Sequence, residues 1–417
     1  MIYKPPKELY YKKGNQLKDF LQSDIVNIMA KEKSLVLEAG TGFGKTNTAI
    51  LAINRVRLKN NLPIVIIVPT NILKTQWESK IIGIDNIYIY VINSYTMTDK
   101  VIKNGFLLII DECHRCLNEE SIFFSKVLKE SNFNYQLLLS ATLEKKHKEF
   151  LINHGINNYY EISIFFMFKN SLLPFFTNYN IPVELNEKEK GEMLVITNEI
   201  DKCIKTFNNF NITNPYQVLD FKSLCKNSNY TEKQLIGIYT KWKKEINKRK
   251  MLIQNCENKF LLVKLLLEKF NNDKILIFCS SIKSAEKMMK ENPFSICLTG
   301  SHSVKQRKLI LDSFYSGHKN HLISIKTLIE GFDVKNCSFG IRTSYSSSSL
   351  NGVQSLGRLL RIDELDENKN VSMFNFYVDD FIINKQLIES QEKKWLKSSQ
   401  RNIINVKNLT INELLQW

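Results

Sequence analysis

The chain has 417 residues, 43% of them hydrophobic and 24% charged, with a formal net charge of +16 at pH 7. At about 150 residues per domain this length predicts two or three domains, and the composition excludes a disordered chain, a fibrous repeat and a disulfide-rich miniprotein. The excess of Lys and Arg favours a polyanion such as nucleic acid as a partner. The alternative is an AT-rich genome, which enriches Lys, Asn and Ile together.

Hydropathy and cysteine usage indicate an intracellular protein. No apolar run approaches the roughly 18 residues of a membrane span, and Met1–Gly14 is basic without an apolar segment, so we expect neither a span nor a secretory signal. Eight cysteines without regular spacing are typical of reduced thiols in the cytoplasm. Cys113 and Cys116 form a C-x-x-C pair with only His114 nearby, so we expect a packing role rather than a zinc site.

Five short apolar runs alternate with helical patterns between Ser34 and about Ile164. Continuous apolar strands separated by helices are typical of a parallel sheet covered on both faces, so these runs predict an α/β unit. The predicted strands are Ser34–Leu37, Pro63–Val68, Ile87–Val91, Phe106–Ile110 and Gln136–Leu139.

The same pattern returns after Lys274 and predicts a second parallel sheet. Its predicted strands are Ile275–Cys279, Ser295–Leu298, His321–Ile325, Ser338–Ile341 and Val371–Phe376. Helices are predicted around Ala285–Met289, Gln306–Phe314 and Gln354–Leu360. The sequence thus predicts two α/β lobes, residues 1–165 and 256–417.

The segment between the lobes, residues 166–255, is predicted to be a mainly helical connection. Apolar residues recur there at steps of three and four, as on one face of a helix. These residues are Leu235, Ile238, Tyr239, Trp242, Ile246 and Ile253. Lys241, Lys244 and Lys248 fall on another face, which is either a nucleic-acid contact or a solvated helix surface.

A glycine-rich turn follows the first predicted strand and precedes a helical pattern. Three of the fifteen glycines of the chain lie in this turn. Glycines allow backbone N–H groups to surround a polyphosphate, a lysine can reach its β and γ phosphates, and a hydroxyl can bind Mg²⁺. The turn is therefore predicted to be a P-loop rather than a simple glycine-rich loop. Its residues are Ala39, Gly40, Thr41, Gly42, Phe43, Gly44, Lys45 and Thr46.

Two adjacent carboxylates complete the predicted nucleotide site. Leu107–Ile110 is an apolar strand that delivers Asp111 and Glu112 to the carboxyl edge of the sheet, where ligands bind in such folds. We expect Asp111 to bind Mg²⁺ together with Thr46, and Glu112 to polarise the attacking water as a general base.

With Asp-Glu-Cys-His at 111–114, the chain resembles superfamily 2 helicases and translocases along nearly its whole length. The resemblance implies two RecA-like lobes that bind ATP between them. It also implies that His114 and Ser140-Ala141-Thr142 couple hydrolysis to movement of nucleic acid. Gln22 is implied to read adenine. Residues of the Val-Pro-Thr motif are implied to contact the nucleic-acid backbone, namely Pro69, Thr70 and Gln76.

The second half carries matching motifs. Glu330-Gly331-Phe332-Asp333 resembles motif V, whose Gly331 and Asp333 are implied to lie at the nucleotide. Gln354–Arg361 matches the Gln-x-x-Gly-Arg-x-x-Arg motif VI. Its arginines, Arg358 and Arg361, lie three residues apart on one helical face and are implied to act as arginine fingers toward the γ-phosphate. Gln354 is implied to belong to the same catalytic site.

Within the superfamily, the motifs look most like the DNA branch that contains XPB, the phage helicase UvsW and restriction motors. The resemblance implies an ATP- and Mg²⁺-dependent DNA helicase or translocase. Because no nuclease motif is present in the sequence, we expect a bare motor with a role in DNA repair or recombination. We expect it to be cytoplasmic, or phage-encoded and acting in the host cytoplasm. Phe43 departs from the small residue usual in the P-loop. An RNA helicase and a non-motor nucleic-acid-binding protein with a degenerate ATPase stay open as alternatives. The oligomeric state is not indicated.

Overall fold

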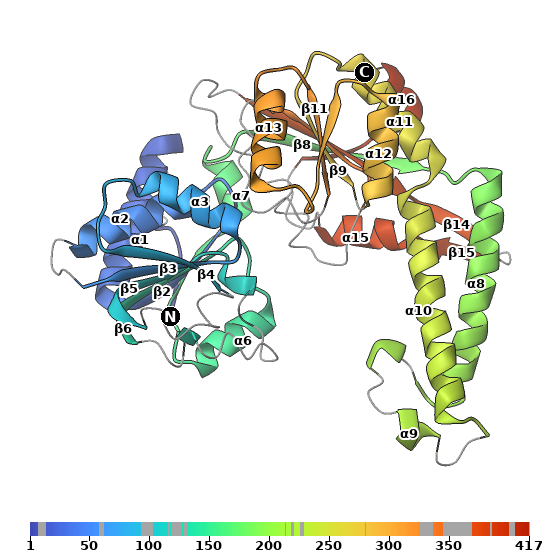
Figure 1. The fold of residues 1–417 in the computed structure, drawn as a ribbon, viewed down its shortest axis with the longest axis horizontal. Helices are drawn as coiled ribbons and strands as arrows, with labels where there is room; N and C mark the ends of the chain where they lie inside the picture. Colours follow the sequence, from blue (N-terminus) through green and yellow to red (C-terminus); the bar gives the residue numbers. More distant parts are fainter. Residues whose placement is uncertain are drawn as a thin grey trace.

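A computed structural model describes most of the chain. The described residues are 1–6, 14–57, 62–92, 103–115, 117, 127–128, 132–212, 214–217, 221–225, 229–279, 281–325, 337–344, 369–383, 386–399 and 405–416. Within them, two seven-stranded parallel sheets form two separate lobes (Figure 1). The predicted fold class, two RecA-like parallel-sheet lobes, is confirmed.

The first sheet contains all five strands predicted in this half of the chain. They are β2 (Ser34–Ala39), β3 (Ile64–Val68), β4 (Ile87–Val91), β5 (Asn104–Ile110) and β6 (Asn132–Ser140). Two short strands, β1 (Ile2–Tyr3) and β7 (Tyr159–Ile162), extend it to the order β1-β7-β2-β6-β5-β3-β4.

Alternate residues of these strands bury opposite faces of the sheet, because successive side chains point to opposite sides. Leu35 and Leu37 pack on the same side as α1 (Gly14–Glu32), α2 (Lys45–Arg57) and α3 (Asn71–Lys80). Val36 packs on the other side with α6 (Lys145–Asn153). Two further helices among the described residues of this half are η2 (Cys113–Arg115) and α7 (Ile164–Lys169). Helices thus cover both faces of the sheet, so a ligand site can form at the carboxyl edge of its strands.

The second sheet also contains its five predicted strands. They are β9 (Ile275–Cys279), β10 (Ser295–Leu298), β11 (His321–Ile325), β12 (Phe339–Arg342) and β13 (Asn370–Val378), joined by β8 (Phe175–Val183) and β16 (Val406–Asn408) in the order β10-β11-β9-β12-β13-β8-β16. The predicted helices near 285–289 and 306–314 are present as α12 (Ile282–Glu291) and α13 (Val304–Tyr315). The predicted helix at 354–360 lies outside the described residues.

The predicted connection needs a correction at β8. We expected residues 166–255 to be mainly helical, but Phe175–Val183 is a nine-residue strand paired in parallel with β13 and β16. The chain therefore enters the second sheet before the long helices begin. The exact boundaries of the lobes stay a prediction.

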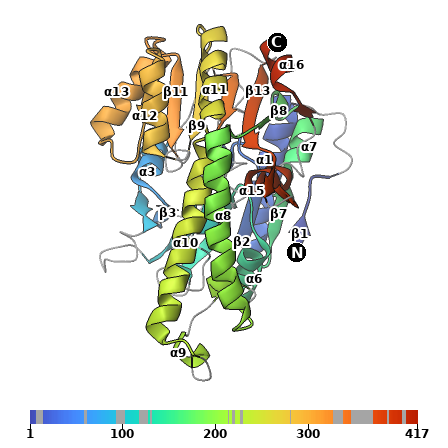
Figure 2. The same cartoon turned by 90° about the vertical axis from the view of Figure 1, so that its right-hand side faces the viewer.

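The helical part is a hairpin that leaves the second lobe after β8 and returns at α11 (Glu257–Lys269) (Figures 1 and 2). Its arms are α8 (Glu187–Asn208) and α10 (Glu232–Gln254), with η3 (Pro215–Gln217) and α9 (Phe221–Leu224) at the far end. Capping boxes at Asn186 and Thr231 begin the two arms. The predicted apolar face of α10 is buried, with Leu235 and Trp242 in a separate core between the arms.

The last part of the second lobe is a small antiparallel hairpin and two helices. These elements are β14 (Asp380–Ile383), β15 (Gln386–Glu389), α15 (Gln391–Ser399) and α16 (Ile411–Gln416). A buried ion pair between Lys259 Nζ and Glu392 Oε2, 2.6 Å apart, joins α15 to α11. No helix in the described part of the chain is long and apolar enough to cross a membrane.

Candidate functional site

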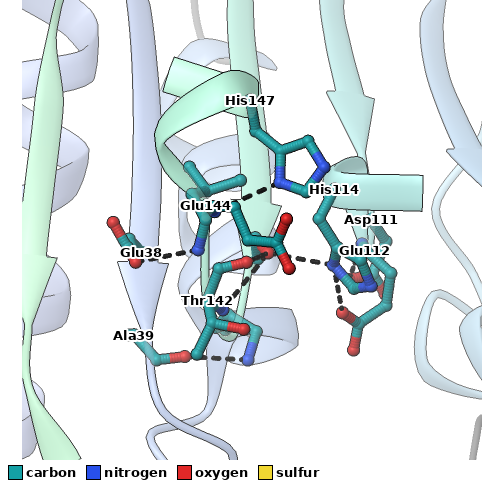
Figure 3. Close-up of polar contacts among 11 residues, drawn as sticks. Glu38, Ala39, Asp111, Glu112, His114, Thr142, Glu144 and His147 are labelled. Atoms are coloured by element: carbon teal, nitrogen blue, oxygen red, sulfur yellow. Dashed lines mark hydrogen bonds and ion pairs between the residues drawn. The ribbon is translucent and has the colours of Figure 1, made fainter. Parts of the chain in front are cut away.

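The P-loop connects the end of β2 to the start of α2 at the carboxyl edge of the first sheet. Gly42 and Gly44 have φ of 92° and 90°, in the left-handed region that favours glycine. Lys45 Nζ donates a hydrogen bond to the Ala39 carbonyl oxygen at 3.0 Å, so this side chain reaches back across the loop (Figure 3). Thr46 follows in the first turn of α2. The strand, loop and helix that the sequence predicts are therefore all present.

Gln22 holds the P-loop from α1. Its Nε2 donates to the carbonyl oxygens of Phe43 at 3.1 Å and Gly44 at 3.4 Å. A Cβ at position 44 would lie 2.7 Å from that nitrogen, so a larger residue there would have to displace the Gln22 amide. The predicted role in reading adenine stays a prediction, but Gln22 has a structural role that the sequence did not indicate.

The departure at Phe43 has a simple structural explanation. Its side chain is fully buried in the core of the first lobe and packs away from the loop surface. Only the backbone of Phe43 is available to a phosphate, and a backbone amide serves equally well whatever the side chain. A large residue at this position is therefore compatible with a P-loop.

Asp111 and Glu112 follow β5, next to the P-loop. Asp111 is 5% exposed and accepts two hydrogen bonds, from Trp77 Nε1 at 2.9 Å and from the Glu112 amide at 3.0 Å. Burial, and next the charge of Glu112, raise the pKa of Asp111 to about 6, although Trp77 and Lys45 act in the opposite direction. Lys45 is thus close enough for its charge to act on this carboxylate.

His114 joins the Asp111–Glu112 turn to the end of β6. Its Nδ1 lies 3.0 Å from Ser140 Oγ and 3.4 Å from Glu112 Oε2 (Figure 3). Burial lowers the pKa of His114 to about 4, so the ring is neutral at pH 7. Ser140 Oγ in turn donates to the Thr142 carbonyl oxygen at 2.8 Å. A continuous chain of contacts therefore runs from Glu112 to the predicted coupling segment 140–142.

The donor set fits a nucleotide with Mg²⁺. Asp111 and Thr46 offer oxygen ligands, which Mg²⁺ prefers, and it usually takes few protein ligands beside substrate phosphates and water. Buried Thr41 Oγ1, Thr142 Oγ1 and Glu112 Oε2 have no hydrogen-bond partner within the described part of the chain. Such oxygens are suited to a polar ligand at this edge.

The predicted nucleic-acid contacts lie at α3. Thr70 caps this helix by accepting from the Leu73 amide at 3.3 Å, and Pro69 directly follows β3. Gln76 is half-buried on α3, next to Trp77. Trp77 is buried, and the sequence indicated no role for it, although a buried indole N–H requires an acceptor.

Several predicted residues lie outside the described part of the chain. These are Gly331, Asp333, Gln354, Arg358, Arg361 and Cys116. Cys113 is fully buried in the core under β5, as expected for a packing role. All seven described cysteines are free.

Comparisons with known proteins agree with the fold. A family model for DEAD/DEAH box helicases matches residues 20–100, and one for the helicase conserved C-terminal domain matches residues 257–363. Together they indicate a superfamily 2 helicase. No curated protein matches the chain.

Solved structures with the same fold include two helicases. Dbp5 of S. cerevisiae, bound to RNA and ADP BeF3, is 12% identical with a TM-score of 0.58, covering 92% of this chain and 88% of that chain. The helicase domain of Hef from Pyrococcus furiosus is 15% identical with a TM-score of 0.54, covering 92% and 97%. At this identity the likeness concerns the fold of a superfamily 2 helicase-type ATPase.

Proposed function

We propose that this chain is a nucleic-acid-stimulated ATPase of superfamily 2 that moves along or remodels DNA. One observation carries the proposal: a single sheet edge brings the P-loop, the Asp111–Glu112 pair and the His114–Ser140 contact together. A P-loop alone would support many nucleotide-binding functions. The additional connection from Glu112 to the segment after β6 supports a motor, in which hydrolysis has to be transmitted.

Each residue of the first lobe has a distinct part in hydrolysis. Lys45 and the loop amides bind the β and γ phosphates, while Thr46 and Asp111 hold Mg²⁺, which neutralises charge that develops on the phosphates. Glu112 orients and polarises the attacking water as general base. ATP use is supported further by Dbp5, whose structure contains ADP BeF3.

The second lobe supplies the groups that respond to closure. Asp333, Gln354, Arg358 and Arg361 are proposed to face the nucleotide when the lobes close, with the arginines stabilising charge in the transition state. Closure on ATP and opening after hydrolysis would move the lobes along a strand held across both.

DNA is proposed as the substrate because the Asp-Glu-Cys-His motif at 111–114 and the neighbouring motifs resemble those of the branch that contains XPB, UvsW and restriction motors. The net charge of +16 supports a polyanion but does not distinguish DNA from RNA. RNA is the second candidate, favoured by the fold shared with Dbp5, which is bound to RNA. A role in repair or recombination in a phage-infected cell is part of the proposal for DNA only.

ATP hydrolysis measured with a panel of nucleic acids tests the proposal. The panel contains single-stranded, duplex and forked DNA and single-stranded RNA, with Glu112→Gln as the inactive control. Stimulation by a DNA arm supports the proposal, and stimulation by RNA alone replaces it with an RNA helicase. Turnover that no nucleic acid changes, or no turnover at all, would leave a non-motor nucleic-acid-binding protein.

A further inference from the structure

We propose that Trp77 is a positioning residue for the Asp111 carboxylate, and that it thereby sets the affinity of the site for Mg²⁺. The proposal rests on the proposed function, in which Asp111 is a magnesium ligand. Trp77 lies on α3 and Asp111 follows β5, so two elements distant in sequence meet at one hydrogen bond, 2.9 Å between Nε1 and Oδ2.

Burial makes this hydrogen bond specific. Trp77 is 1% exposed and Asp111 is 5% exposed, so water does not readily replace either partner. The other carboxylate oxygen, Oδ1, accepts from the main-chain amide of Glu112 at 3.0 Å. One side-chain donor and one main-chain donor thus fix the plane of the carboxylate. The indole N–H is the donor that a substitution can remove.

Residues that hold a metal ligand in place commonly matter almost as much as the ligand. Loss of such a partner typically lowers metal affinity 10–100-fold, because the ligand must then be ordered by the metal itself. Trp77 is suited to position a metal ligand, because its ring is packed in the core of the lobe and this packing restricts rotation away from Asp111.

The helix that carries Trp77 also begins at the proposed nucleic-acid contact. Thr70 caps α3, and Trp77 follows seven residues later, about two helical turns or roughly 10 Å along the axis. A nucleic-acid strand bound at the first turn of α3 would therefore act on the same helix that carries Trp77, the residue hydrogen-bonded to the metal ligand Asp111. This gives Trp77 a position from which nucleic acid and Mg²⁺ can influence each other.

Trp77→Phe tests the proposal because it keeps a buried aromatic ring and removes the N–H donor together with the volume of one ring, a loss of volume that the control variant shares. Trp242→Phe is the matched control, since Trp242 is also buried but its indole nitrogen has no hydrogen-bond partner in the described residues. The full chain is loaded with a fluorescent ADP, and Mg²⁺ is titrated. Affinity for the same ADP is measured separately in EDTA.

We expect Trp77→Phe to raise the half-saturating Mg²⁺ concentration about tenfold or more, with ADP affinity in EDTA unchanged. Trp242→Phe should change neither quantity. An unchanged half-saturating Mg²⁺ concentration in Trp77→Phe would overturn the proposal. So would an equal loss of ADP affinity in EDTA, because that result indicates general damage to the site. Failure of the wild-type chain to bind ADP would instead contradict the proposed function.

A measurement on the wild-type chain covers the case in which Trp77→Phe does not fold. The indole N–H resonance of Trp77 is assigned by elimination, using Phe variants of the other three tryptophans. In the ADP complex this resonance should shift when Mg²⁺ is added, while that of Trp242 stays in place. If the Trp77 resonance did not shift when Mg²⁺ is added, the indole would not be coupled to the metal ligand, and the proposal would be wrong.

Discussion

Asp111 and Glu112 are neighbours in sequence but lie in different surroundings. Asp111 is buried with both oxygens hydrogen-bonded, whereas Glu112 has a left-handed backbone with φ of 51° that turns its carboxylate toward His114. Two carboxylates in unlike environments can take different roles, one as a fixed ligand and one as a base. The sequence predicted both roles from position alone, and the geometry gives each a physical basis.

Lys45→Ala and Glu112→Gln should therefore fail in different ways. Lys45→Ala removes the lysine of the phosphate cradle and should abolish turnover. Glu112→Gln should retain ATP and Mg²⁺ while losing 10²–10⁴-fold in turnover, because only the base is neutralised. Steady-state ATPase assays and nucleotide binding distinguish the two variants. Hydrolysis by Glu112→Gln at the wild-type rate would remove Glu112 from the catalytic role.

His321 predicts how stability depends on pH. This residue is fully buried at the start of β11, and burial lowers its pKa despite the nearby charge of Asp273. The folded chain keeps His321 neutral, but the unfolded chain takes up a proton below about pH 6.5, so the free energy of unfolding falls as the pH decreases. Each pH unit below that value costs up to about 1.4 kcal/mol until the folded-state pKa is reached.

His321→Leu should remove this contribution, since leucine fills a similar buried space without a titrating group. Urea unfolding at pH 7.5 and pH 5.5 measures the difference in stability for each protein. The variant should lose less stability between the two pH values than the wild type. An identical loss in both would mean that other groups, such as buried His114 and His147, account for acid sensitivity.

At the scale of elements, α7 packs against the P-loop at Gly40. A Cβ at Gly40 would lie 2.8 Å from Ile164 Cγ1 and 3.2 Å from Met167 Sδ, so the loop and this helix approach as closely as a glycine allows. The chain continues from α7 to β8 in the second sheet. The segment that leaves the first lobe thus packs directly on the proposed phosphate site.

Gly40→Ala should destabilise the first lobe by about 1–3 kcal/mol, the usual cost of inserting a methyl group into a packed contact. Ile164→Ala removes the atom that the new Cβ would meet, so the double variant should be more stable than the sum of the two single losses predicts. Chemical denaturation of the four proteins of this cycle measures the coupling. If the two losses of stability simply add, the methyl group at position 40 and Ile164 do not interact, and α7 accommodates the methyl group without strain.

Lys241, Lys244 and Lys248 of the hairpin show how ion pairs affect the assignment of positive charge to nucleic-acid binding. Lys241 Nζ lies 2.5 Å from a Glu199 oxygen and Lys248 Nζ lies 2.6 Å from a Glu245 oxygen, so two of the three predicted contacts are already paired with carboxylates. Lys244 is exposed and forms no ion pair with an acidic residue in the described part of the chain. The pairing favours a solvated surface over a nucleic-acid contact.

Replacing Lys241, Lys244 and Lys248 by Gln should therefore leave the salt dependence of nucleic-acid binding unchanged. In the wild type, log K should fall linearly with log salt, by about 0.7 per phosphate contact on a single strand. Binding isotherms at several salt concentrations give both slopes. A shallower slope in the triple variant would place these lysines on the nucleic acid after all.

At the scale of the whole molecule, the sequence predicted ten strands because each is a short, mainly apolar run. It missed β8 because this strand contains polar residues in its interior. Asn178 and Asn180 of β8 are buried, and Asn375 Nδ2 of β13 donates to Asn178 Oδ1 at 3.0 Å. Hydrogen bonds from Asn375 Nδ2 to the amide oxygens of Asn178 and Asn180 join these neighbouring strands. The partners are nearly 200 residues apart in sequence, so no local pattern reveals them.

The two-lobe arrangement leads to a prediction about Arg361, which lies outside the described residues. ATP affinity should come mainly from the P-loop of the first lobe, whereas an arginine of the second lobe meets the γ-phosphate only on closure. Arg361→Ala should therefore reduce turnover on the order of a thousandfold or more, the typical effect of an arginine finger. The loss of ground-state binding should not exceed about 3 kcal/mol, the upper value for one charged hydrogen bond.

Nucleic acid should also stop stimulating hydrolysis in Arg361→Ala, because closure would no longer complete the site. ATPase rates with and without DNA, beside ATP affinity measured in the Glu112→Gln background, separate turnover from binding. Lys45→Ala is the contrasting variant, since it should fail without regard to closure. Equal DNA-stimulated turnover in Arg361→Ala and the wild type would contradict the proposed two-lobe mechanism, in which Arg361 completes the site only when the lobes close.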